Sequence, residues 1–439
     1  MRAETWRVGG IVLAAGIVLG TAPAGAMTLQ EALAHAQATN PTLAAEQAHL
    51  RAIDEQIPQA MSGYKPTVTA TLGISRDMAN TRYQGGGGER TETNAKSASV
   101  SASQPLYDAT VAPAVRRAER LVEAERATLL ATGQTVLLNA ATAYLDVVKD
   151  QELVALNAAN EKLLQRQLKA AQDRARAGEY TRTDVAQADS RLAQAVASRL
   201  AAEGTLENAR ATFERLVGTA PGTLAAPKPS FHLPRSIEEA TALARANNPS
   251  VLSAAYGEDA QRHRIDQQFG QMLPTASLSA SGSRTWDPGV DSGVDYTRTD
   301  SLTARVQVTA PLYQAGLPDS QVREAKQTAQ QYRLQAHDLG DQSVESAVTA
   351  WTALETAKAN IQSYRDQIKA AQTALEGLRE EAKVGSRTLL DVLDQEQELL
   401  NSRVNLVTAQ HDETVAAFQL LAACGQLSPE QLGLSKDGH

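Results

Sequence analysis

The sequence predicts an α+β membrane protein that combines a long α-helical coiled-coil barrel with a β-barrel shared among protomers. Three observations support this fold class: a secretory leader, long proline-free stretches of helix-forming residues, and segments in which apolar and small polar residues alternate. The helical and alternating segments occur twice in the same order, so we interpret the chain as a tandem duplication of one unit.

The first 26 residues have the features of a cleaved signal peptide. Arginines at positions 2 and 7 precede an apolar run at 8–19, and small residues at 24–26 suit a signal peptidase. The run is shorter than the ~20 apolar residues that a membrane-spanning helix requires. No later segment offers about 18 consecutive apolar residues, so we expect the mature chain to cross a membrane by strands.

The duplication is visible as landmarks that recur after 206 to 208 residues. These landmarks are Asn40-Pro41 with Asn248-Pro249, Lys65-Pro66-Thr67 with Leu273-Pro274-Thr275, Pro105-Leu106-Tyr107 with Pro311-Leu312-Tyr313, and Gly133, Gly178 and Gly218 with Gly340, Gly385 and Gly425. The repeats are therefore predicted at residues 27–217 and 236–425, with a linker at 218–235 and a C-terminal tail at 426–439.

Each repeat is predicted to contain a very long helix that turns back into a shorter return helix. Residues 114–220 and 319–428 contain no proline, and a helix over 114–176 would be about 95 Å long. The return arms are expected at about 181–217 and 388–423, with shorter helices near 28–60 and 236–270 stacked end to end with them. The second return arm has a 4-3 apolar stripe, which indicates a coiled coil: Leu400, Val404, Val407, His411, Thr414, Phe418 and Leu421.

Two strands are predicted in each repeat, near 66–78 and 95–106 and near 274–286 and 297–311. One face of each is apolar and the other carries serine and threonine, as in a membrane barrel with lipid outside and water inside. The apolar residues include Val68, Leu72, Val100, Leu278 and Val306. Four strands cannot close a barrel, and open edges are forbidden in lipid, so the barrel must be shared among protomers. The polar hairpin tips are expected at 83–93 and 286–296.

Composition excludes several classes of function. A net charge of −8 argues against a nucleic-acid partner. The sequence contains no phosphate-binding loop and no catalytic constellation, so we predict neither an enzyme nor a cofactor site. The seven histidines are scattered and indicate no metal site. The single cysteine, Cys424, lies among leucines and alanines and is expected to be a buried small hydrophobe.

The duplicated plan, the Pro-Leu-Tyr motifs and above all residues 384–394 (VGSRTLLDVLD) resemble the TolC family of outer-membrane efflux proteins. The resemblance covers nearly all of residues 28–425, and the last motif is close to the periplasmic-tip turn of that family. It implies a homotrimer with a twelve-stranded barrel in outer-membrane lipid and a long periplasmic portion. It also implies docking to a periplasmic adaptor (membrane fusion) protein and an inner-membrane transporter, in efflux or type I secretion.

The resemblance also assigns site residues. It implies that Asp391 and Asp394 form carboxylate rings at the constricted periplasmic entrance. It further implies that Thr183, Asp184 and Arg387 belong to the polar network that holds this entrance shut. Ala382 occupies the place of the family's gate tyrosine, so the bonds that close this chain differ in part.

The residues by themselves leave other readings open. Asp391 and Asp394 could simply complement the positive end of a helix, and Arg387 could be a solvated turn residue. The competing function is a periplasmic adaptor or coiled-coil scaffold without a pore. Neither of those predicts two hairpins of membrane-type strands in phase with the duplication.

Overall fold

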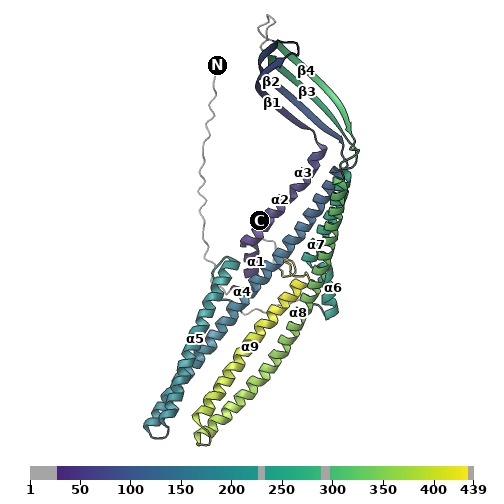
Figure 1. The fold of residues 1–439 in the computed structure, drawn as a ribbon. Helices are drawn as coiled ribbons and strands as arrows, with labels where there is room; N and C mark the ends of the chain where they lie inside the picture. The colour runs from purple at the N-terminus through teal and green to yellow at the C-terminus, as the bar shows by residue number, and fades with distance from the viewer. Residues whose placement is uncertain (1–26, 226–232, 288–296, 434–439) are drawn as a thin grey trace, which may run out of the picture.

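The molecule is a long rod with a β-sheet at one end and helical hairpins that reach the other end (Figure 1). The computed structural model describes residues 27–225, 233–287 and 297–433. The predicted signal peptide at 1–26, the centre of the linker and most of the second hairpin tip lie outside the described residues.

The described residues contain a four-stranded antiparallel sheet in the order β1-β2-β3-β4. Its strands are β1 (Thr67–Arg82), β2 (Gly88–Tyr107), β3 (Thr275–Asp287) and β4 (Thr297–Thr309). The partners Leu72, Ala98 and Arg284 stand side by side across the first three strands. The pairing of β2 with β3 joins the two repeats, while β1 and β4 are the two edges.

The first hairpin is longer than the sequence predicted. β1 continues to Arg82 and β2 begins at Gly88, so the turn is confined to residues 83–87 rather than 83–93. Gly86 and Gly87 have positive φ angles of 85° and 131°, which suit a tight turn. The ladder continues through the threonines and charged residues beyond the apolar segment because backbone pairing does not require apolar side chains.

Four long helices form the two hairpins of the rod: α4 (Val111–Arg176) with α5 (Arg182–Val217), and α8 (Leu317–Lys383) with α9 (Leu389–Ala423). The 66 residues of α4 correspond to about 99 Å of helix. In each repeat the long helix follows the second strand and its partner returns antiparallel (Figure 1). No helix in the described ranges has the length and apolarity needed to cross a membrane.

The short helices at 28–60 and 236–270 are broken, which corrects the prediction of one helix in each place. The segments are α1 (Leu29–Thr39), α2 (Pro41–Asp54), α3 (Gln56–Met61) with a 3₁₀ turn η1 (Ser62–Tyr64), and α6 (Ile237–Asn247) with α7 (Pro249–Gly270). Asn40 and Asn248 precede prolines and adopt extended backbone, with ψ of 122° and 123°. A residue before proline disfavours the helical region, and each asparagine instead caps the next helix.

The core of the rod is built mainly from alanine and leucine. Its largest cluster lies around Tyr144 and Phe213, whose ring centroids are 6.3 Å apart. Phe418 and Leu421 of the predicted stripe on α9 are buried, whereas Leu400 is only half-buried and Ser402 and Ala409 beside the stripe are buried instead. The single predicted stripe is wrong in this respect because α9 packs against both α8 and α4.

The beginning of the described chain is fastened to the linker. The Met27 N–H donates to the Thr223 carbonyl at 3.0 Å, and the Ala225 N–H donates to the Met27 carbonyl at 3.3 Å. The Tyr144 hydroxyl lies 2.8 Å and 2.7 Å from the carbonyl oxygens of Met27 and Ala225. Both ends of the first repeat therefore meet on α4.

Cys424 is fully buried against Ala240 and Leu420, as predicted. Burial, together with the nearby Glu239 carboxylate, raises the pKa of its thiol to about 11. The thiol is therefore protonated and shielded at neutral pH.

Candidate functional site at the helical tips

The two tips farthest from the sheet have the same backbone design (Figure 1). Gly178 and Gly385 adopt left-handed conformations, with φ of 82° and 79°. Each glycine ends a long helix, since a residue with a Cβ would be strained there. The next N–H groups, of Glu179 and Ser386, donate back to the carbonyls of Arg174 and Glu381 at 2.9 and 3.0 Å.

The return helices begin with matched capping boxes. The backbone N–H of Asp184 donates to the Thr181 hydroxyl at 3.2 Å, and the Asp184 carboxylate accepts from the Thr181 N–H at 2.9 Å. Thr388 and Asp391 repeat these contacts at 3.2 and 2.9 Å. Asp184 and Asp391 therefore accept hydrogen bonds from N–H groups at the beginning of their helices, which would otherwise lack a partner within the helix.

Asp391 nevertheless keeps its charge. Hydrogen bonds from the backbone N–H and the hydroxyl of Thr388 lower the pKa of the Asp391 carboxyl, and the Arg387 guanidinium lowers it further. A carboxyl with a lowered pKa is ionised at neutral pH. The second tip therefore presents a fixed negative charge.

Arg387 is held within its own turn. Its Nε donates to the Glu381 carboxylate at 3.0 Å, and both side chains are 52% exposed. At the equivalent positions of the first tip, Arg174 donates to the Tyr180 hydroxyl at 2.8 Å and stacks over its ring. In the described protomer, Arg387 is therefore joined to Glu381 and not to Thr183 or Asp184.

Asp394 is ion-paired with Arg191 of α5, a contact that connects the two hairpins near their tips. Residues that the sequence separates by 203 positions meet here. The sequence carried no signal for Arg191 because a lone arginine on a polar helix face has many possible partners. The ion pair uses the Oδ1 atom of Asp394, whose side chain is 54% exposed.

A second contact that the sequence missed lies deeper between the hairpins. The Glu396 carboxylate is buried and accepts from the Gln167 amide at 2.6 and 2.8 Å and from Arg379 at 2.7 Å. These residues come from α9, α4 and α8 respectively, so one carboxylate connects three helices. A charged residue among the leucines at 393, 399 and 400 was the available signal.

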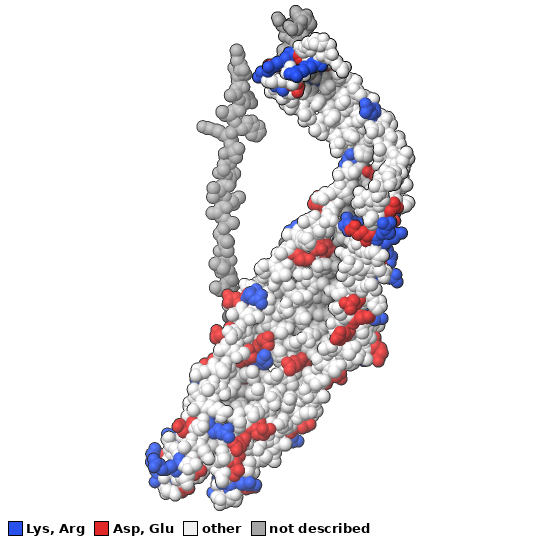
Figure 2. All heavy atoms as spheres, in the orientation of Figure 1, with Lys and Arg blue, Asp and Glu red and all other residues white. Residues whose placement is uncertain are grey.

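The remaining predicted residues lie at the same end. Thr183 is exposed on the first turn of α5, next to Asp184. Ala382 packs beside the cluster of Ala371, Leu375 and Val392 and offers no side-chain donor where the family pattern has tyrosine. Both signs of charge gather at these tips (Figure 2).

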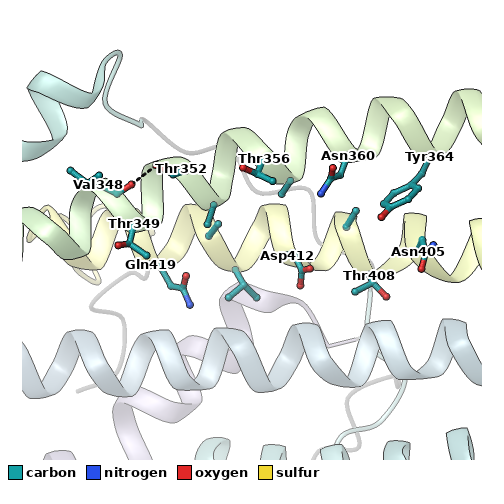
Figure 3. A pocket seen from close by; sticks show the side chains of 15 residues that line it. Val348, Thr349, Thr352, Thr356, Asn360, Tyr364, Asn405, Thr408, Asp412 and Gln419 are labelled. Carbon is teal, nitrogen blue, oxygen red and sulfur yellow. Dashed lines mark hydrogen bonds between the residues drawn. The ribbon is translucent and has the colours of Figure 1, made fainter.

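Farther from the tips, a groove of about 700 Å³ runs between α8 and α9 (Figure 3). Its lining is mostly small and uncharged: Thr349, Thr352, Ala353, Thr356, Asn360, Thr408 and Gln419 belong to it. Asp412 supplies a carboxylate. Across the described residues, no cluster of three or more histidine, cysteine or acidic side chains could hold a metal ion.

A sheet that cannot close alone, joined to paired helices about 100 Å long, defines a membrane channel with a helical duct. The model of the family described as outer membrane efflux protein matches residues 32–219 and 241–426, and the chain belongs to that family.

Known proteins agree with this assignment. The chain is 35% identical to the outer membrane efflux protein BepC of Brucella suis, over 97% of this chain and 91% of BepC. It is 26% identical to the outer membrane protein TolC of Escherichia coli, over 93% of this chain and 84% of TolC. The fold matches the outer membrane channel CmeC of Campylobacter jejuni with a TM-score of 0.79 and 16% identity, over 91% and 85% of the two chains.

The predicted fold class, localisation and type of function are confirmed. The protein is an outer-membrane exit duct of the efflux or type I secretion type, with a periplasmic helical barrel and a β-barrel shared among protomers. It is a channel protein and not an enzyme. TolC-family channels are homotrimers that work with adaptors and inner-membrane transporters.

Proposed function

We propose that this chain forms a homotrimer whose periplasmic entrance is the ring of helical tips, with Asp391 and Asp394 as its carboxylates. The proposal rests chiefly on one observation: an ionised Asp391 and the Asp394–Arg191 pair lie together at the end of the duct away from the membrane. Two carboxylates from each of three protomers would surround one axis. Low-dielectric walls focus the field of such a ring, which favours cations.

Thr183, Asp184 and Arg387 form the gate network in this proposal, and Arg191 belongs with them. The Arg191–Asp394 pair connects α5 to α9 within one protomer. Opening requires the hairpins to separate, so the Arg191–Asp394 pair is a contact that holds the closed state. The Arg387–Glu381 pair holds the turn of the second tip itself. Arg191 also reduces the negative charge that Asp394 presents to a cation.

The entrance is tested by single-channel recording of trimers in planar bilayers. The wild type should conduct weakly, prefer cations and be blocked by a trivalent metal complex added on the periplasmic side. Asp391→Asn with Asp394→Asn should relieve the block, while asparagine keeps an oxygen that can accept from Thr388. Arg191→Gln should strengthen the block because it leaves Asp394 uncompensated, and Arg387→Ala should raise conductance.

The matched control is Asp338→Asn with Asp341→Asn. These aspartates have the same spacing and are exposed on α8 far from the tips, so the block should be unchanged. An equal block in the wild type and in the Asp391/Asp394 variant would reduce both aspartates to helix-start residues.

The duct also requires partners. We propose that a periplasmic adaptor protein contacts the tips and that an inner-membrane transporter loads the duct through it. Support comes from the tip motif at residues 384–394, in which residues 384–388 are exposed. The buried Cys424 thiol allows cysteines to be introduced without removing the native one.

Ser386→Cys places a thiol at the tip, and Gln271→Cys places a matched exposed thiol near the sheet. A thiol-reactive crosslinker in whole cells should join the adaptor to the first variant and not to the second. Crosslinking of both variants, or of Gln271→Cys alone, would contradict docking at the tips.

A further inference from the structure

The sheet carries two charged triads in which one carboxylate lies between two arginines. In the first hairpin, Arg76 and Arg90 donate through Nη2 to the two oxygens of Glu92 at 3.0 and 3.2 Å. In the second hairpin, Asp300 accepts from the Nη2 groups of Arg284 and Arg298 at 3.2 and 2.6 Å. Each triad has a net charge of +1.

The triads are equivalent positions of the duplication. All three members recur after 208 residues: Arg76 and Arg284, Arg90 and Arg298, and Glu92 and Asp300. Neighbouring positions differ between the repeats, since Asn94 corresponds to Leu302 and Lys96 to Ala304. The charged unit therefore stayed the same where residues around it changed.

The triads lie on the lipid-facing side of the sheet. Side chains two apart on a strand share a face, so Arg76 follows Ile74 on the apolar face of β1. Arg284 stands opposite Ala98 on one side and Asp300 on the other. Asp300 in turn precedes Leu302 on the apolar face of β4.

Their position along the strands is the outer end of the apolar band. The unbroken series of apolar side chains on this face ends at Ile74 of β1 and Leu302 of β4, which are 83% and 89% exposed in the single protomer. Beyond Arg76, Met78 is a single large apolar side chain on the same face of β1. Charged residues continue from there toward the hairpin tips, where basic and acidic side chains gather (Figure 2). Because the helices are periplasmic, this end of the band faces the outer leaflet.

A pair of arginines at the outer end of the apolar band is suited to bind phosphate groups. An arginine has five N–H donors in a planar fork, and Arg76 and Arg90 each use Nη2 on Glu92 while their side chains remain 60% and 66% exposed. Guanidinium groups bind phosphate oxygens in bidentate geometry. Lys96, which pairs with Ile74 in the sheet register, adds a further cation to the same face.

We propose that the two triads of each protomer are binding sites for the phosphate-bearing headgroups of outer-leaflet lipids. The apolar strand face contacts the acyl chains while the arginines hold the headgroup, so each lipid is bound at two points. The carboxylate keeps the two guanidinium groups of a triad side by side.

The test uses purified wild-type trimers titrated with lipid A that carries both phosphates and with lipid A from which both have been removed. Native mass spectrometry counts the bound lipids. We expect the phosphorylated form to bind more tightly. Arg76→Gln with Arg284→Gln should weaken binding at each triad roughly five-fold, because each site loses one basic residue near a charged lipid surface.

Two controls separate lipid binding from a role in strand pairing. Arg305→Gln removes an arginine of β4 with the opposite parity, which faces the lumen, and should leave lipid binding unchanged. Glu92→Gln with Asp300→Asn breaks the same triads but raises their positive charge, so lipid binding should be retained or increased. A purely structural triad would instead lose stability in both kinds of variant without a change in lipid preference.

Three outcomes would overturn the proposal: equal binding of the two lipid forms, wild-type binding by the Arg76/Arg284 variant, or displacement of the lipid by millimolar inorganic phosphate alone. Conductance and periplasmic block are recorded on the same trimers. They should be unchanged in the arginine variants, so this test is independent of the entrance.

Discussion

The two helical tips share a backbone and differ in charge. Both have a left-handed glycine and a threonine–aspartate capping box. The contact across the turn, however, is Arg174 with Tyr180 in the first tip and Glu381 with Arg387 in the second. Duplication has therefore kept the residues that fold the turn and changed those that face solvent, which is where functional differences are expected.

The same division continues along the hairpins. Asn40 and Asn248 make equivalent bonds to the carbonyls of Leu216 and Ala423, at 3.2 and 3.1 Å. In contrast, the buried Glu396 of the second repeat corresponds to an exposed Asp189 in the first. Glu396 of the second hairpin thus contacts α4, whereas the equivalent Asp189 of the first hairpin faces solvent.

The sheet should be where the two repeats behave most alike. Leu72→Arg in the first repeat and Val306→Arg in the second should each destabilise the inserted barrel by about 2–4 kcal/mol near the bilayer midplane. Thr71→Arg and Gln307→Arg face the lumen and should be tolerated. Denaturant unfolding in lipid vesicles measures the stability of all four variants. An equal loss of stability on the two faces of the strands would show that the faces are misassigned.

The buried carboxylate should distinguish the repeats. Glu396→Ala removes the acceptor shared by Gln167 and Arg379 and should cost about 1.5–3 kcal/mol, as for hydrogen bonds to a charged group. Asp189→Ala, at the equivalent exposed position, should have almost no effect. Thermal dissociation of the oligomer is the measurement, and similar losses in both variants would contradict the asymmetry.

The two capping boxes should respond alike to substitution, with a smaller loss of stability than at the buried carboxylate. Thr181→Ala and Thr388→Ala each remove an N-cap and should cost about 0.5–2 kcal/mol of local stability. Hydrogen exchange in the first turns of α5 and α9 should accelerate to a similar extent. Faster exchange in one tip alone would show that the two capping boxes contribute unequally to the stability of their helices.

The smallest expected effect is a dependence of stability on pH that comes from His411 of the second repeat. The ring nitrogens of His411 lie 2.9 Å from Asp412 and 3.1 Å from Asp146, with Lys149 and Asp150 beside them on α4. Burial opposes protonation, but the bonds to Asp146 and Asp412 raise the pKa of His411 overall. The equivalent position in the first repeat is Gly204.

A raised pKa means that protonated His411 stabilises the α4–α9 contact below the unfolded value and that this contribution is lost as pH rises through the folded pKa. Thermal stability should therefore fall as the pH rises above the ordinary pKa of histidine and through the raised pKa of His411. His411→Gln should flatten the profile, whereas the exposed control His337→Gln should leave it as in the wild type. A wild-type profile in the His411 variant would rule out this histidine.

Patterns of local spacing predicted most of the fold. Alternation with a period of two located the four strands, and the absence of proline located α4, α5, α8 and α9. The breaks at Asn40 and Asn248 were missed although the prolines that follow them are visible in the sequence. At the tips, capping residues were readable, but Arg191 with Asp394 and Gln167 with Glu396 depend on how two hairpins pack, which no local pattern encodes.

The fastening of Met27 has a consequence for how the protein is made. Its partners, Thr223 and Ala225, lie almost two hundred residues later in the chain, and Tyr144 connects them. During export the N-terminal end emerges first but cannot dock until the linker has also crossed the inner membrane. The contact at Met27 therefore forms only when the whole first repeat is present in the periplasm.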